Sequence, residues 1–177
     1  MIDFSKISLK ELAMILGKKF KEHGIDCTLV GGACVSIYSE NKYQSYDLDY
    51  VTFETVKTIG NILLDLGFFR KNRYFVHEKC PFYVDLVSPP VALGNEPITK
   101  FSTLKSPIGE VKLLTPTDCV KDRLAGFYHW NDLQAFEQAI IVSRDQKIDL
   151  NEIKRWSVQE ECISKFEIFK EKLNEVI

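Results

Sequence analysis

Apolar residues recur at helical spacing near the start of the chain. From Leu9 to Phe20 they return every three or four positions, with polar residues between them. Ser8 and Glu11 form the Ser-x-x-Glu pattern of a capping box, and Gly24 is a typical stop after the last turn. This pattern predicts a helix over residues 8–23.

A short β-rich run comes next and ends at a glycine pair. Residues 27–30 have the composition of a strand, Gly31 and Gly32 follow, and residues 33–38 suit a short helix. The glycine pair is therefore predicted to lie at a strand-to-helix turn.

The middle of the chain switches between the period-two pattern of strands and the spacing of helices. Its last two strands are predicted to form an antiparallel pair that turns around residues 77–81. The elements predicted here are a strand over 47–53, a helix over 55–66 ended by Gly67, and strands over 68–76 and 82–87.

The pattern becomes mainly helical in the last third of the chain. The elements predicted here are a loop over 89–100, a hairpin of 101–105 with 110–114, and helices over 116–127, 132–142, 151–160 and 163–176. Together they predict an α/β (α+β) fold, with a mixed sheet flanked by helices in residues 1–114. Residues 115–177 are predicted to form a helical part packed on that core as one compact unit.

Composition narrows the class of protein only a little. The 177 residues carry a formal net charge of -2, which gives no bulk electrostatic reason for coating nucleic acid or an anionic membrane. The first residues lack a signal-peptide pattern and no stretch is long enough to span a bilayer, so we expect a cytoplasmic protein. Five scattered cysteines, without a Cys-x-x-Cys pair, predict reduced thiols in apolar surroundings.

Three aspartates on predicted strands are the candidate chemistry. Asp47 and Asp49 are two residues apart, so both side chains point to one face, roughly 7 Å apart for a rise of about 3.3 Å per residue. Asp85 lies on a later strand between Val84 and Leu86. Carboxylates in this arrangement suit Mg²⁺, which takes one or two protein carboxylates and completes its shell with phosphates and water.

Each of these features also has a purely structural interpretation. The glycine pair can be only a tight turn, although without side chains it would let phosphate oxygens approach the backbone. Asp47 and Asp49 can be solvated edge-strand residues, but aspartate is depleted in strands. A single strand aspartate such as Asp85 is often merely exposed.

In order and spacing, these motifs resemble the nucleotidyltransferase superfamily. More narrowly, the chain resembles the small bacterial AbiEii-type toxins of abortive-infection and toxin–antitoxin systems. The matching positions are Val30, Gly31 and Gly32, then Ser45, Asp47 and Asp49, then Asp85, and finally Thr115, Pro116, Asp118, Lys121, Arg123, Leu124, Ala125 and Asp132.

The resemblance implies a nucleotidyltransferase-like fold and a two-metal reaction. A nucleoside triphosphate with Mg²⁺, or Mn²⁺ in its place, would give its nucleoside monophosphate to a hydroxyl of RNA, a protein or a small molecule. Asp47, Asp49 and Asp85 are the implied catalytic and metal-binding residues. The implied phosphate-binding residues are Gly31, Gly32, Ser36, Lys121 and Arg123.

Lys121 and Arg123 are two residues apart on a predicted helix and so do not share a face. At most one of them is expected to reach the phosphates, and Lys121 is the slightly favoured choice.

The chain departs from the superfamily pattern at three positions, where it has Ala33, Gln44 and Asn131. These departures favour an alternative, in which an inactive fold binds a nucleotide or a partner such as a cognate antitoxin. A purely structural domain with an acidic groove is a third interpretation.

Overall fold

The structure is a computed structural model that describes residues 2–176. Its main sheet has seven strands in the order β3-β4-β5-β2-β1-β9-β8. The strands are β1 (Cys27–Val30), β2 (Asp47–Thr52), β3 (Phe69–Lys71), β4 (Tyr74–Val76), β5 (Tyr83–Val87), β6 (Ala92–Leu93), β7 (Glu96–Pro97), β8 (Phe101–Ser106) and β9 (Gly109–Leu114). The helices are α1 (Leu9–Glu22), α2 (Gly32–Tyr38), α3 (Val56–Leu64), α4 (Pro116–Trp130), α5 (Leu133–Asp145), α6 (Leu150–Gln159) and α7 (Ile163–Val176).

Helix α1 begins as its sequence predicts. The Ser8 hydroxyl accepts a hydrogen bond from the Glu11 backbone N–H at 3.2 Å, and the Ser8 N–H donates to Glu11 Oε2 at 2.8 Å. This reciprocal capping box satisfies two N–H groups that have no partner within the helix. The predicted helix is thereby confirmed, with His23 as its C-cap.

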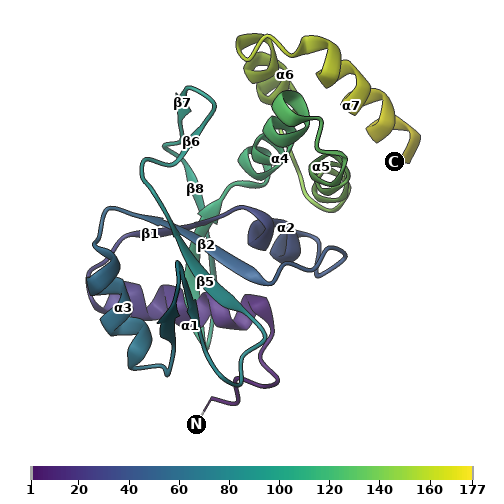
Figure 1. Cartoon of the computed structure of the whole chain (residues 1–177). Helices are drawn as coiled ribbons and strands as arrows, with labels where there is room; N and C mark the ends of the chain where they lie inside the picture. Colours follow the sequence, from purple (N-terminus) through teal and green to yellow (C-terminus); the bar gives the residue numbers. More distant parts are fainter. Residues whose placement is uncertain (1, 177) are drawn as a thin grey trace.

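The sheet is mixed, and its pairing decides where the aspartates point. Strand β2 runs antiparallel to β1 and parallel to β5. The Tyr50 hydroxyl donates to the Ala13 carbonyl of α1 at 3.2 Å, so that side chain points to the face covered by α1. Because side chains alternate along a strand, Asp47 and Asp49 point to the opposite face. Figure 1 shows α1 and α3 close together beside the sheet, away from the C-terminal helices.

Two predictions about the middle of the chain are wrong. Residues 68–76 do not form one strand, because the chain reverses between β3 and β4, where Asn72 has a φ of +57°. Asparagine tolerates this left-handed conformation better than most residues. The predicted loop over 89–100 contains the short antiparallel pair β6–β7, which turns at Gly94 with a φ of +59°.

The predicted antiparallel pairing of the neighbouring strands is confirmed. Phe75 of β4 lies opposite Val84 of β5, and β8 pairs antiparallel with β9.

The four C-terminal helices are confirmed, and α4 and α5 each extend three residues further at their C-terminal ends than predicted. Polar side chains supply the N-caps of three of the four: Thr115 for α4, Asp132 for α5 and Asp149 for α6. Asp132, which the family resemblance singles out, accepts from the Ala135 N–H at 3.0 Å and so has a structural role as a cap.

The helical part lies beyond one end of the sheet and follows directly from β9 (Figure 1). It contacts the core through α2 and α5, where Gln146 Nε2 donates to the Tyr38 carbonyl at 2.8 Å. A continuous cluster of buried apolar residues extends from α1 through the sheet to α7. None of the helices within residues 2–176 has both the length and the apolar character that a membrane crossing requires. The cysteines are free thiols, and Cys27, Cys34 and Cys119 are buried.

Candidate functional site

The three aspartates come together on one face of the sheet. Asp49 of β2 lies directly opposite Asp85 of β5 in the parallel register, and Asp47 lies two residues earlier on β2. All three side chains lie on the face that α1 does not cover. The predicted convergence of carboxylates is therefore present in the fold.

Gly31 packs directly against Asp49. Its φ is +70°, which L side chains rarely adopt, and a Cβ at this position would lie 2.6 Å from Asp49 Oδ2. A Cβ at Gly32 would lie 3.1 Å from the Ser45 hydroxyl. The turn predicted from the glycine pair thus places its backbone against the carboxylate.

Ser45 links Asp47 to α2. Its hydroxyl donates to Asp47 Oδ1 at 2.6 Å, and its N–H donates to the Ser36 hydroxyl at 2.7 Å. Ser36 is buried, so its hydroxyl fixes the segment before β2. The predicted phosphate contact of Ser36 has no counterpart in this arrangement.

Negative charge at the site is poorly compensated. Burial, followed by the charges of Asp47 and Asp85, raises the pKa of the Asp49 carboxyl from 3.8 to about 7. The positive charge of Arg123 acts in the opposite direction. A carboxyl group whose pKa is raised by two like charges is a candidate for binding a cation or a proton.

Asp85 is the best compensated of the three. Its Oδ2 accepts from Arg73 Nε at 3.0 Å and also from Arg73 Nη2, while its Oδ1 accepts from the Leu86 N–H at 3.0 Å. The partner Arg73 comes from the β3–β4 hairpin, whose reversal the sequence pattern did not predict.

Helix α4 brings Arg123 toward the carboxylates. Arg123 Nε donates to Asp122 Oδ2 at 3.1 Å, and Nη1 donates to Gln138 Oε1 at 3.2 Å. The charge of Arg123 lowers the pKa of Asp49, whereas that of its partner Asp122 raises it.

Lys121 lies in a different charged cluster. Its Nζ is 3.1 Å from Glu152, 3.3 Å from Asp118 and 3.6 Å from Glu96, and the residue is only 1% exposed. These partners line a cavity of about 410 Å³ between the β6–β7 hairpin and the helical part. Of the two basic residues, Arg123 is the one whose charge lowers the pKa of Asp49.

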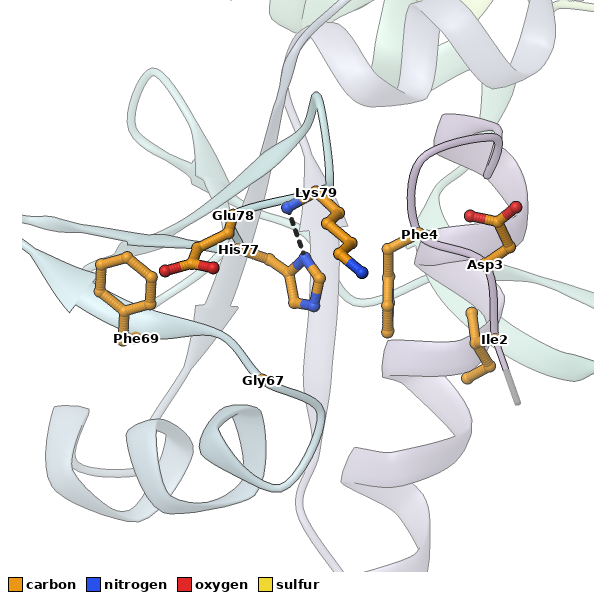
Figure 2. Close-up of a pocket in the computed structure, with 8 residues that line it drawn as sticks. All are labelled: Ile2, Asp3, Phe4, Gly67, Phe69, His77, Glu78 and Lys79. Atoms are coloured by element: carbon orange, nitrogen blue, oxygen red, sulfur yellow. Dashed lines mark hydrogen bonds between the residues drawn. The ribbon is translucent and has the colours of Figure 1, made fainter.

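Another cavity, of about 600 Å³, lies away from the aspartates. Figure 2 shows His77 and Lys79 on one side of it and Phe4 of the N-terminal segment across from them. The Lys79 N–H donates to His77 Nδ1 at 3.1 Å, and the His77 ring packs against Phe4 and Phe68, which also contact each other. These contacts indicate a structural role for His77 at this cavity.

The fit of a divalent cation rests on Asp47 and Asp49. Among residues 2–176, no group of three or more His, Cys, Asp or Glu side chains is arranged to hold a metal ion. The predicted three-carboxylate set is not formed as it stands, because Arg73 occupies the Asp85 oxygen. Asp47 and Asp49 still fit Mg²⁺, since two protein carboxylates suffice for it and the raised pKa of Asp49 marks uncompensated charge.

Four residues of the site were not predicted from the sequence. Arg73 and Gln138 carry no local signal, because only the tertiary fold brings them to Asp85 and Arg123. Asp122 is adjacent to Arg123, and Tyr83 lies opposite Asp47 in the register. The period-two pattern of β5 could have identified Tyr83 as sharing a face with Asp85.

Comparison with known proteins supports the fold. Neither the protein families nor the curated proteins give a match. Similar solved structures include an antigenic nucleotidyltransferase-like protein from Paracoccidioides brasiliensis, 16% identical with a TM-score of 0.59 over 76% of this chain and 74% of that one. They also include the antibiotic-resistance factor ANT(2'')-Ia, 12% identical with a TM-score of 0.53 over 98% of this chain and 97% of that one. The chain thus has a nucleotidyltransferase-like α/β fold with a helical C-terminal part, as predicted.

Proposed function

We propose that the protein transfers a nucleoside monophosphate from a nucleoside triphosphate to an acceptor hydroxyl. The observation that carries the proposal is the meeting of Asp47, Asp49 and Asp85 on one face, with Gly31 packed against Asp49. The nucleotidyltransferase-like neighbours support the same reaction class.

Each part of the site has a role in this proposal. Asp47 and Asp49 would hold Mg²⁺ or Mn²⁺, which when bound neutralises the carboxylates and draws charge from the triphosphate. The backbone at Gly31 and Gly32 would lie against phosphate oxygens, because no side chain blocks their approach. Arg123 would supply positive charge on the α4 side, in place of Lys121.

Asp85 would accept the proton of the acceptor hydroxyl. The hydroxyl oxygen then forms a bond to the α-phosphorus, and the bond between that phosphorus and the oxygen leading to the β-phosphate breaks. Pyrophosphate leaves, and the nucleoside monophosphate remains on the acceptor.

A second candidate is a nucleotide- or partner-binding protein without turnover. The Arg73 contact favours it, because a carboxylate that is paired with a guanidinium is a poor proton acceptor. The narrower resemblance to toxins suggests a cognate antitoxin as the partner. For the transferase alone, the acceptor, whether RNA, protein or small molecule, is to be found by its dependence on the nucleotide site.

Titration calorimetry with Mg²⁺ and each of ATP, GTP, CTP and UTP tests the proposal. We expect saturable, metal-dependent binding of at least one triphosphate to the wild-type protein. Binding should disappear in the double variant Asp47→Asn/Asp49→Asn, because both carboxylates that fit the cation are then neutral. Circular dichroism would verify that the variant is folded.

The matched control is Asp26→Asn/Asp65→Asn, which removes two exposed carboxylates away from the site. It should bind the triphosphate as the wild type does. Absence of binding by the wild type to all four triphosphates would rule out the transferase. Binding that is retained without any pyrophosphate release would instead favour the second candidate.

A further inference from the structure

Arg73 is placed at the rim of the site by a tight reversal. Asn72, with its φ of +57°, turns the chain between β3 and β4, and β4 pairs with β5 through Phe75 and Val84. This pairing holds the hairpin beside the strand that carries Asp85. The guanidinium reaches back over that strand and donates to Asp85 Oδ2.

The two partners of this ion pair differ strongly in exposure. The Arg73 side chain is 69% exposed, whereas the Asp85 side chain is 4% exposed. The guanidinium carbon also lies 5.0 Å from the centre of the Tyr74 ring. Arg73 therefore covers a buried carboxylate from the solvent side, and a rotation of its own side chain would uncover that carboxylate.

The oxygen that Arg73 occupies is needed elsewhere in the proposed reaction. Asp85 Oδ2 cannot hold the guanidinium and at the same time take up a proton or a metal ion. Its other oxygen already accepts from the Leu86 N–H at 3.0 Å. Oδ2 therefore becomes available only when Arg73 leaves, and Oδ1 has one acceptor site left beside the Leu86 N–H.

A divalent cation is suited to displace Arg73. Asp49 lies directly opposite Asp85 in the parallel register, so a divalent cation near both carboxylates would offset two charges, whereas the exposed guanidinium pairs with one. A displaced Arg73 would remain beside the site, and a planar guanidinium pairs well with phosphate oxygens.

We propose that Arg73 is an exchangeable counter-cation of Asp85, which a divalent cation displaces and which then binds the phosphates of the nucleotide. This inference rests on the proposed function. It assigns to one residue two opposite effects, because Arg73 competes with the metal and assists the nucleotide.

The test uses the full chain with Arg73→Gln, and Lys71→Gln as the matched control. Lys71 lies on the same hairpin and is exposed, so its substitution removes the same charge without touching Asp85. Binding of Mn²⁺ alone, followed by electron paramagnetic resonance of the free ion, should be about tenfold tighter in Arg73→Gln. Binding of ATP at saturating Mn²⁺, followed by calorimetry, should be about tenfold weaker. Lys71→Gln should change each constant by less than about twofold.

The outcomes separate the inference from the proposed function. Equal Mn²⁺ affinities in the two variants, or weaker binding of both Mn²⁺ and ATP in Arg73→Gln, would overturn the inference while the wild type still binds metal and nucleotide. Failure of the wild type to bind either one overturns the inference and the proposed function together. If Arg73→Gln does not fold, Arg73→Lys keeps the charge but loses the fork, and we expect from it the same two effects at smaller size.

Discussion

Two charged clusters in this protein differ in how far their negative charges are paired with cations. Between the β6–β7 hairpin and the helical part, Lys121 is within 3.6 Å of three carboxylates, and Arg155 pairs with two of the same three. On the sheet, Asp47, Asp49 and Asp85 lie together, and Arg73 pairs with only one of them.

We infer from this difference that the Lys121 cluster serves the fold, and we propose that the aspartates serve a ligand. Buried charges that stabilise a structure are paired, since an unpaired buried charge is costly. Carboxylates that lie together without paired cations do not stabilise the fold, so their presence needs another explanation. Binding of a metal cation is one such explanation. Burial, followed by the like charges of Asp47 and Asp85, raises the pKa of Asp49, as expected for a carboxylate without a paired cation.

The strongest test of this difference removes Lys121, the cation that the three carboxylates share. Lys121→Met leaves Asp118, Glu152 and Glu96 without their shared partner. We expect the free energy of unfolding to fall by about 3 kcal/mol, as for a buried ion pair that loses one member. Urea denaturation measures it.

Lys100→Met is the control, because Lys100 lines the same cavity but is exposed. Its cost should be below about 0.5 kcal/mol. A similar, small loss in both variants would show that Lys121 is not structural. At a temperature where Lys121→Met is folded, its affinity for a triphosphate should equal that of the wild type. A large loss there would restore the phosphate-binding role that the sequence predicts for Lys121.

A second test of the difference between the clusters changes the backbone that packs against Asp49. Gly31→Ala places a Cβ 2.6 Å from Asp49 Oδ2, at a residue whose φ is +70°. Gly24→Ala is the matched control, because Gly24 has a φ of +69° and an added Cβ there meets nothing within 4 Å. Both variants carry the strain of a positive φ, but Gly31 also has a ψ of −152°, a combination that only glycine adopts readily. Metal binding, more than the difference in stability, therefore reports the contact with the carboxylate.

We expect a loss of about 2 kcal/mol for Gly31→Ala and about 1 kcal/mol for Gly24→Ala, measured by thermal unfolding. Only Gly31→Ala should also lose metal binding, because Asp49 has to move. Equal losses with intact metal binding in both variants would mean that Gly31 is merely a turn residue, which is the structural interpretation of the glycine pair.

The sequence predicted those features of the site that depend on local geometry. The turn at Gly31 and the shared face of Asp47 and Asp49 follow from backbone conformation and from the period of a strand. The roles of Arg73 and Lys121 depend on which elements pack together, and no local pattern contains that information.

The same distinction applies to the secondary structure. The capping box at Ser8 correctly located the start of α1. In the structure Thr115 and Asp149 likewise cap α4 and α6. The β3–β4 hairpin was missed, because its reversal depends on a single left-handed residue, Asn72, within an otherwise strand-like run.

The smallest expected effect concerns the pH dependence of stability. The folded-state pKa of Asp49 is about 7, above its ordinary value of 3.8. Between these values the folded protein holds a proton that the unfolded chain has released, so stability falls as the pH rises and the loss is complete above pH of about 7. Asp49→Asn removes this charge. The free energy of unfolding of Asp49→Asn should therefore be roughly 1–2 kcal/mol higher than that of the wild type at pH of about 8. This difference should become smaller as the pH falls toward about 4.

Denaturant unfolding at several pH values, with and without Mg²⁺, distinguishes this electrostatic origin from a packing effect. Mg²⁺ should narrow the gap at high pH, because a cation offsets the repulsion in the wild type but has little to bind in the variant. Asp65→Asn, at an exposed carboxylate, should show neither dependence. If Asp49→Asn is more stable than the wild type by the same amount at every pH, the gain comes from packing. Asp49 would then not carry uncompensated charge, and the contrast between the two clusters would be wrong.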